Sequence, residues 1–345
     1  MLFKTIKKQD LFDLYFSDVQ CIGPKKVGTN NKGKPIYQFL PFFSFDEIDL
    51  DYETTEYSAK TYFLPYKETL SSFKFKDDDW TQEINYSTQP RVIIGLHPCD
   101  INALVKLDKV FEKTLFPNPY YITRRQNTFV VGIDCKKSCD RGFCSSMGSY
   151  TVTHGFDLFL TDIGDSYFVK IGSDRAFNAL QKIRTSEITK EDNELYLQTR
   201  NKFEDGLEKT VRVENLPNLL DIEFESDVWG KWGDRCLSCG TCAMVCPTCY
   251  CYGVTEQISM DFNKSDKIKQ LYSCNLNDFA QVAGGHNFRP EPATRLKYRY
   301  YHQHRGFVES FGQPMCVGCN RCGRICLAGI NPTDVITDLQ REQKR

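Results

Sequence analysis

The chain has 345 residues, enough for two domains, and a formal net charge of −1. Hydrophobic residues make up 41% and charged residues 26%, which is ordinary globular usage and excludes wholesale disorder. The charge balance argues against a protein that coats nucleic acid, because such proteins carry a basic excess. Apolar runs are of strand length, far below the roughly 20 residues of a membrane span. We therefore expect neither a nucleic-acid partner nor a membrane.

The unusual feature of the composition is its 16 cysteines. The first residues, MLFKTIKKQDLF, lack the apolar segment of a signal peptide, so we expect a cytoplasmic protein. Thiols stay reduced in that compartment and are available to metals. Only five histidines are present, which leaves little room for metal sites built on imidazole.

The N-terminal part reads as mixed α and β structure. Residues 91–96 (RVIIGL) and 128–133 (TFVVGI) are short runs rich in β-branched side chains, typical of buried parallel strands. Between them, residues 100–111 place apolar side chains at helical spacing behind Asp100. This order predicts a βαβ unit with a right-handed crossover.

The following segments differ in character along the chain. Apolar runs at 156–160 and 167–171 flank a Gly-Asp turn at 164–165, which predicts a hairpin. Residues 175–225 are polar and weakly helical, and we expect them to bridge to a second domain. Residues 236–345 are expected to be mostly helix and loop.

The strongest motif is a run of cysteines that ends in proline. Cys236, Cys239, Cys242 and Cys246, followed by Pro247, have the C-x₂-C-x₂-C-x₃-C-P spacing of bacterial ferredoxins. In that motif three close cysteines bind one [4Fe–4S] cluster and the fourth reaches the neighbouring cluster. A pair of Cys₄ zinc sites is the alternative, but zinc knuckles combine two CxxC units rather than runs of four.

A second run of cysteines, 316–326, repeats this spacing without the final proline. The repetition predicts two [4Fe–4S] clusters that exchange their fourth ligands. The predicted ligands are Cys236, Cys239, Cys242 and Cys326 for the first cluster, and Cys246, Cys316, Cys319 and Cys322 for the second.

A third site follows from the predicted topology. Cys99 comes just after the first predicted parallel strand and Cys135 just after the second, followed by Cys139 and Cys144. Neighbouring parallel strands end side by side, and ligands bind beyond their carboxyl ends. Four thiols are thus expected to converge on a third [4Fe–4S] cluster, with ordinary buried cysteines as the alternative. The less favoured substitute ligands are His97 and Asp100.

Together these elements predict an α+β fold in two domains. Residues 1–225 are expected to form a mixed α/β domain that contains the βαβ unit and the third site. Residues 226–345 are expected to form a mostly helical ferredoxin-type domain with two clusters.

Three cysteines, Cys249, Cys251 and Cys274, lie outside these sets, with His302 and His304 as possible companions. A zinc site or a further Fe–S site is one interpretation, and thiols that shield the adjacent clusters are the favoured one.

The segment 284–305 is basic and aromatic. We interpret its Arg and Lys side chains as compensating cluster charge and contacting a partner protein, rather than binding nucleic acid. Cys21 stands alone and is expected to be uninvolved.

Several common cofactor motifs are missing from the sequence. There is no GxGxxG after a predicted strand, no Walker lysine loop and no CxxCH haem motif. No acid–base or nucleophile constellation stands out either. We therefore expect a non-catalytic electron-transfer subunit with no flavin or nucleotide of its own.

A set of short motifs spans roughly residues 60–332: YFLP at 62–65, GLHPCD at 95–100, GIDC at 132–135, FC at 143–144, GFDLF at 155–159, CLSCGTC at 236–242, CPTCYC at 246–251, AGGHNFRP at 283–290 and CVGCNRC at 316–322. In these motifs the chain resembles one iron–sulfur family, which includes the β subunit of cytosolic NiFe sulfhydrogenases and an iron–sulfur subunit of anaerobic sulfite reductases. Two departures concern the sites: Gly142 stands where family members often have a cysteine, and Leu327 replaces the customary proline. Cys139 is then expected to supply the missing ligand from a shifted position.

The resemblance implies a role inside an anaerobic, multi-subunit oxidoreductase. A flavoprotein subunit that binds FAD and NAD(P)H would exchange electrons with this chain, and a NiFe hydrogenase subunit would be the terminal partner. A sirohaem sulfite reductase is the alternative terminal partner. Two other classes remain open: a self-contained reductase that uses an open-site cluster, and an assembly scaffold without redox turnover.

Overall fold

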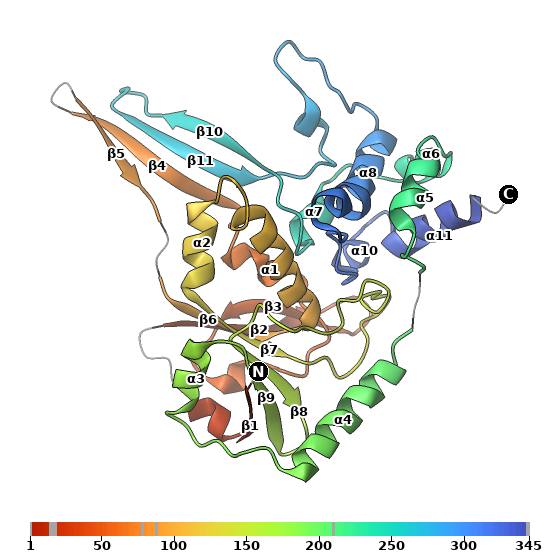
Figure 1. Cartoon of the computed structure of the whole chain (residues 1–345). Helices are drawn as coiled ribbons and strands as arrows, with labels where there is room; N and C mark the ends of the chain where they lie inside the picture. The colour runs from red at the N-terminus through yellow and green to blue at the C-terminus, as the bar shows by residue number, and fades with distance from the viewer. Residues whose placement is uncertain (1, 14–18, 77–78, 87–88, 209–210, 343–345) are drawn as a thin grey trace.

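The computed structural model describes residues 2–13, 19–76, 79–86, 89–208 and 211–342, and Figure 1 shows their arrangement. Two β-sheets and a group of short helices make up the molecule. Residues of the larger sheet lie in the first half of the chain, whereas the helical group comes mostly from the last third. The mixed α/β fold class expected from the sequence is confirmed, and so is the helix-rich C-terminal part.

The larger sheet has seven strands in the order β1-β9-β8-β7-β6-β2-β3. Its centre is parallel, because β2, β6, β7 and β8 run the same way, and the outer strands are antiparallel. Every residue of β6 and β7 is buried, as expected for strands covered on both faces. The strand bounds are β1 Leu2–Lys7, β2 Gln20–Thr29, β3 Pro35–Pro41, β6 Arg91–Leu96, β7 Thr128–Ile133, β8 Leu158–Asp162 and β9 Ser166–Ile171.

The predicted βαβ unit is confirmed. Helix α1 (Pro98–Phe111) and then α2 (Pro119–Gln126) lie in the connection from β6 to β7, and these strands are parallel neighbours. The predicted hairpin is also confirmed, since β8 and β9 pair in antiparallel fashion. Neighbouring residues of β6 pack in different hydrophobic clusters. Ile93 packs with side chains of α1, and Val92 packs in the cluster on the opposite face of the sheet.

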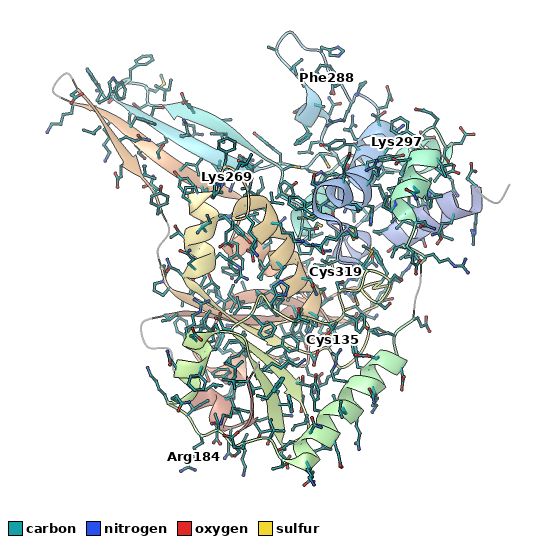
Figure 2. All side chains as sticks on the ribbon, viewed as in Figure 1. Cys135, Arg184, Lys269, Phe288, Lys297 and Cys319 are labelled. Atoms are coloured by element: carbon teal, nitrogen blue, oxygen red, sulfur yellow. The ribbon has the colours of Figure 1, made fainter. Side chains whose placement is uncertain are left out.

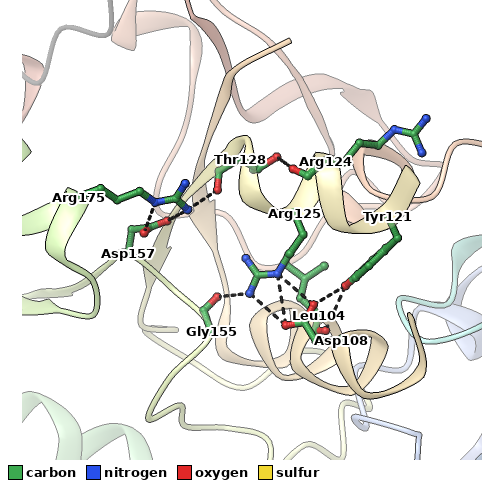
Figure 3. Close-up of polar contacts among 9 residues, drawn as sticks. All are labelled: Leu104, Asp108, Tyr121, Arg124, Arg125, Thr128, Gly155, Asp157 and Arg175. Carbon is green, nitrogen blue, oxygen red and sulfur yellow. Dashed lines mark hydrogen bonds and ion pairs between the residues drawn. The ribbon is translucent and has the colours of Figure 1, made fainter. Parts of the chain in front are cut away.

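Polar contacts tie α1 to the following helix and, through it, to the segment before β8, as Figure 3 shows. Arg125, in α2 (Pro119–Gln126), pairs with Asp108 of α1 at 3.1 Å and donates to the Gly155 carbonyl at 3.0 Å. The Tyr121 hydroxyl donates to the same carboxylate at 2.6 Å. These bonds hold the helix that carries Cys99 in its first turn.

The second sheet has the order β10-β11-β4-β5 and projects away from the rest of the molecule in Figure 1. It joins two pairs of strands that are far apart in sequence. These are β4 (Lys67–Lys76) with β5 (Asp79–Ile84), and β10 (Tyr252–Ile258) with β11 (Lys264–Leu271). The sequence predicts mostly helix and loop for residues 236–345, and the hairpin of β10 and β11 was not predicted. The two-domain division at residue 225 remains a prediction, and this sheet draws on both sides of it.

The C-terminal helices pack around Trp229, Trp232, Leu296 and Ile336. A π-helical turn (His302–Gly306) separates two of them. Among the described residues no helix is both long and apolar enough to cross a bilayer. The remaining helices are α3 Asp174–Leu180, α4 Lys190–Asp205, α5 Leu216–Ile222, α6 Val228–Gly233, α7 Thr241–Val245, α8 Pro292–Tyr301, α9 Phe307–Phe311, α10 Arg321–Arg324 and α11 Pro332–Glu342, with short 3₁₀ turns at Asp10–Asp13, Phe45–Glu47, Ala59–Tyr62 and Asn277–Ala280.

Candidate metal centres

The two cysteine runs adopt the same local backbone conformation. In each run the third and fifth residues have positive φ: Ser238 (51°) and Gly240 (76°) in the first, Gly318 (66°) and Asn320 (54°) in the second. Each run then enters a short helix, α7 or α10. Left-handed residues curl the chain tightly, so that neighbouring cysteines can face one point. The duplicated spacing is thus a duplicated local structure.

A first cavity lies beside the 236–242 run. It contains all four thiols predicted for the first cluster, together with Cys322 of the other run. Leu237 and Leu327 on its wall are 64% and 88% exposed, so this cavity lies near the surface. The four thiols predicted for the first cluster are Cys236, Cys239, Cys242 and Cys326.

A second cavity lies deeper, between the two runs and the π-helical turn. Its lining includes Phe143, Gln303 and His304. It also contains the four thiols predicted for the second cluster, and Cys322 lines both cavities. The four thiols are Cys246, Cys316, Cys319 and Cys322.

Buried cations face these thiols. Arg299 lines both cavities and is 7% exposed, and its charged neighbours are thiols: burial opposes its charge, but Cys242 and Cys322 raise its pKa well above the ordinary value. Lys60 is 2% exposed and donates to the Cys249 carbonyl at 2.9 Å. Among the described residues neither cation has a carboxylate partner. Burying a cation without an anion costs several kcal/mol, so these side chains fit a site that holds a negatively charged thiolate-bound group.

Buried hydrogen-bond donors that have no partner also indicate a site for a negatively charged, thiolate-bound group. Arg299 Nε and Arg321 Nη1 are buried without a hydrogen-bond partner in the described part of the chain. Asn275 Nδ2 already donates to Cys242 Sγ at 3.2 Å. Donors of this kind hydrogen-bond the sulfurs of iron–sulfur clusters, so the donor set fits [4Fe–4S] groups.

The third predicted site lies at the carboxyl ends of β6 and β7. Cys99 is in the first turn of α1, and Cys135 follows β7 by two residues. Burial raises the pKa of the Cys135 thiol, and Cys139 and Cys144 raise it further. Cys135 in turn acts on Cys99. Cys135 therefore lies within electrostatic range of each of the other three thiols.

Cys139 takes up the space beside Gly142. A Cβ at Gly142 would lie 3.2 Å from the Cβ of Cys139. The Cys139 thiol itself donates to the Glu53 carbonyl at 3.3 Å. Cys139 therefore lies next to Gly142, the position at which members of the family that the chain resembles often have a cysteine.

The third site lies against the second cysteine run. Cys319 is among the charged neighbours of both Cys99 and Cys144, and Figure 2 labels Cys135 and Cys319 at the junction of the sheet and the helices. Phe143 N donates to the Gly318 carbonyl at 2.8 Å. All three groups of thiols therefore form one continuous region.

Comparison with known proteins adds two findings. Residues 235–330 match the family described as "4Fe-4S dicluster domain". The whole chain is 33% identical over 333 residues to the protein named Sulfhydrogenase 2 subunit beta of Pyrococcus furiosus, covering 96% of each chain. The chain belongs to the sulfhydrogenase β-subunit family. The resemblance expected from the motifs is thereby confirmed.

This membership makes the chain an iron–sulfur electron-transfer subunit that carries [4Fe–4S] clusters and works in a multi-subunit assembly. A search of solved structures returned no match.

Three thiols of this sulfhydrogenase-family chain, Cys249, Cys251 and Cys274, are not among the predicted cluster ligands. Cys249 packs with Cys246 and accepts a hydrogen bond from Gln303 Nε2 at 3.5 Å, and Cys274 lies near Cys251 and Cys242. Within the described ranges, no group of three or more Cys, His, Asp or Glu side chains is arranged to hold a single metal ion.

The basic segment 284–305 divides into two parts. Arg295 Nη2 donates to Ser238 Oγ at 2.9 Å, inside the first cysteine run. Arg305 instead pairs with Asp221 at 2.8 Å on the surface. Cys21 lies in β2 and pairs with Val92 near the amino end of β6, whereas Cys99 follows the carboxyl end of that strand. Sequence reasoning missed Lys60 and Gln303, because no spacing rule connects either residue to a cysteine motif.

Proposed function

We propose that this chain is the electron-relay subunit of a cytosolic multi-subunit oxidoreductase. It passes electrons between a flavoprotein subunit that binds FAD and NAD(P)H and a terminal NiFe hydrogenase subunit. The observation that carries the proposal is the continuity of the thiol groups, since Cys322 lines both cavities and Cys319 faces Cys99 and Cys144. A relay needs adjacent redox sites that lead through the protein.

The proposed ligands are those of the sequence analysis. When bound, a [4Fe–4S] cluster supplies reversible one-electron chemistry. The shared cavity linings support Cys236, Cys239, Cys242 and Cys326 for one cluster, and Cys246, Cys316, Cys319 and Cys322 for the next. For a third cluster we propose Cys99, Cys135, Cys139 and Cys144.

The protein's own side chains would hold and insulate these groups. Arg299, at the wall common to both cavities, offsets negative charge without needing a carboxylate. Asn275 donates to a ligand thiol. Buried Tyr300, also common to both linings, excludes water between them. Each contribution stabilises a thiolate-bound group in a site of low polarity.

The surface position of the first cavity makes it the proposed exchange point with a partner. Cys239 is exposed, whereas Cys246 is buried. The name of the relative, a sulfhydrogenase subunit, favours a hydrogenase over a sulfite reductase as the terminal partner.

Anaerobic purification at native expression level, followed by mass spectrometry of the co-purifying chains, tests this function. We expect a flavoprotein and NiFe hydrogenase subunits. A sirohaem protein in their place would assign the relay to a sulfite reductase. A chain that purifies alone with reductase activity intact would contradict the relay.

A further inference from the structure

The hairpin of β10 and β11 ends in a turn that exposes two large apolar side chains. Met260 is 96% exposed and Phe262 is 74% exposed, and both lie in the short segment that joins the two strands. The hairpin belongs to the four-stranded sheet that projects from the rest of the molecule (Figure 1). The turn lies at the outer end of this sheet, where another molecule can reach it.

Hydrogen bonds within the turn fix its shape. Ser259 Oγ donates to Asp261 Oδ1 at 2.5 Å, and the backbone N–H of Lys264 donates to Ser259 Oγ at 2.9 Å. The backbone N–H of Asn263 donates to the same Asp261 oxygen at 3.2 Å, and the Asn263 carbonyl accepts from Phe75 N of β4 at 2.8 Å. The turn is therefore ordered before any partner binds, which reduces the entropy cost of binding.

Phe262 adopts a left-handed backbone conformation, with φ 59°. Glycine and asparagine adopt this conformation at low cost, whereas a phenylalanine there is strained. Because most of its side chain is exposed, burial within the chain offsets little of that strain. Strain of this kind is concentrated at functional sites. The conformation of Phe262 thus points to a contact outside the chain.

The apolar surface continues from the turn onto one face of the sheet. Phe75 and Trp80 are cross-strand neighbours whose ring centroids lie 5.1 Å apart, and both are exposed. Ile258 pairs with Ser265, and Ser265 pairs with Phe73, so Ile258 shares the face of Phe73 and of Phe75 two residues on. We call these exposed side chains the tip patch: Phe75, Trp80, Ile258, Met260 and Phe262.

The charges beside the tip patch decide which kind of partner fits it. Lys74 pairs with Glu83 at 3.6 Å, and Lys264 pairs with Asp266 at 2.7 Å. An anionic lipid surface or a nucleic acid is attracted by free cations, and these two lysines already have carboxylate partners. Charged side chains on the outer strands, such as Glu83 and Glu256, oppose edge-to-edge pairing of two copies. An apolar, uncharged protein pocket fits the patch best.

We propose that the tip patch is the contact site for another protein subunit of the assembly, which accepts Met260 and Phe262 in an apolar pocket. This inference rests on the proposed function, because it takes the chain to be one subunit of a larger oxidoreductase. Large apolar side chains on a rigid turn are the kind of anchor that dominates the affinity of protein interfaces. Family membership supplies the partner, since the family works in multi-subunit assemblies.

The first test is photo-crosslinking in the anaerobically purified complex of the full chain. The photoreactive residue p-benzoylphenylalanine replaces Phe262 in one variant and Gln257 in the control. Gln257 is exposed too, but it precedes Ile258 in β10 and so lies on the opposite face. We expect position 262 to cross-link to a different subunit, identified by mass spectrometry, and to do so more than position 257. Cross-links only to a second copy or to lipid, or none at all, would overturn the proposal.

The second test compares how tightly variants of the full chain hold the rest of the assembly. Met260→Gln and Phe262→Asn remove the apolar side chains, and asparagine suits the left-handed backbone, so the turn is kept. We expect each to raise the dissociation constant, measured by native mass spectrometry on dilution, about tenfold or more. Asp261→Ala breaks the hydrogen bonds of the turn but keeps both anchors, so its effect should be smaller. Gln257→Ser is the control and should have none.

The outcomes separate this inference from the function on which it rests. Wild-type dissociation constants in both Met260→Gln and Phe262→Asn would overturn the contact site and leave the relay intact. An equal loss of affinity in Gln257→Ser would also overturn it, because the tip patch would then have no special part. A wild-type chain that purifies without any other subunit would overturn the proposed function as well.

Discussion

Arg321 Nη2 donates to Asp100 Oδ2 at 2.8 Å, and the two side chains are 1% and 2% exposed. Asp100 directly follows Cys99, and Arg321 stands between Cys319 and Cys322. The guanidinium also donates to the carbonyl and hydroxyl of Thr55. This buried pair therefore ties the third cysteine group to the second run, although the partners are 221 residues apart in sequence.

Asp100→Asn should destabilise the protein strongly, because it leaves the Arg321 cation buried without its anion. Breaking one side of a buried pair costs about 3–5 kcal/mol. The measurement is the thermal midpoint under anaerobic conditions. Asp140→Asn is the matched control, because its pair with Lys34 is exposed on both sides and such pairs contribute little to stability. Equal midpoints for the two variants would contradict this account.

Cys99→Ala should remove one cluster's worth of iron, about four atoms per chain. The cause is the loss of one proposed ligand at the site beyond β6 and β7. Iron analysis of the purified variant measures the effect. Cys21→Ala provides the control, since that thiol lies in β2 and contacts the Val19 carbonyl. Retention of all iron in Cys99→Ala would remove the third site from the account.

Gly318→Ala should loosen the contact between the 135–144 loop and the second cysteine run. Gly318 has φ 66°, and a Cβ there would lie 2.6 Å from the backbone of Phe143. The left-handed conformation alone costs an alanine about 1–2 kcal/mol, and the clash adds to it. Gly33→Ala isolates the first effect, because Gly33 has φ 74° and no atom within 4 Å. Equal falls in the thermal midpoints of Gly318→Ala and Gly33→Ala would show that the contact with Phe143 does not contribute to stability.

Acid should weaken the fold partly through His304. Burial lowers the pKa of His304 to about 3, whereas an unfolded histidine has its pKa near 6.5. The unfolded chain therefore takes up a proton first, and stability falls as the pH drops below 6.5, by up to about 1.4 kcal/mol per unit for one such group. His304→Gln should reduce the drop in thermal midpoint between pH 7.5 and 5.5. The same change at His154, an exposed position, controls for the substitution itself, and a wild-type drop in the His304 variant would contradict the assignment.

The sequence predicts the βαβ unit well because its signals are local. Residues 91–96 and 128–133 are continuous apolar runs, and the helix between them has a clear period. The cysteine runs are equally local, since their spacing recurs in the repeated positive φ values of Ser238 and Gly318.

Features that depend on distant pairing are not predictable in this way. Strands β4 and β11 pair across most of the chain, and much of each is polar and partly exposed, so no apolar pattern identifies them. The position of Gln303 in the second cavity was likewise not predictable, because no pattern in a single sequence identifies a π-helical turn. Nothing in the sequence indicates that Arg321 is buried, because its partner Asp100 is distant in sequence and is brought beside it only by the tertiary structure.

The most direct test of the central claim is low-temperature EPR of the dithionite-reduced full chain, combined with iron and zinc analysis. Three clusters predict about twelve irons per chain, and their adjacency predicts signals broadened by spin–spin interaction. A chain that contains zinc in place of iron and gives no signal on reduction would contradict the relay and leave only a structural role.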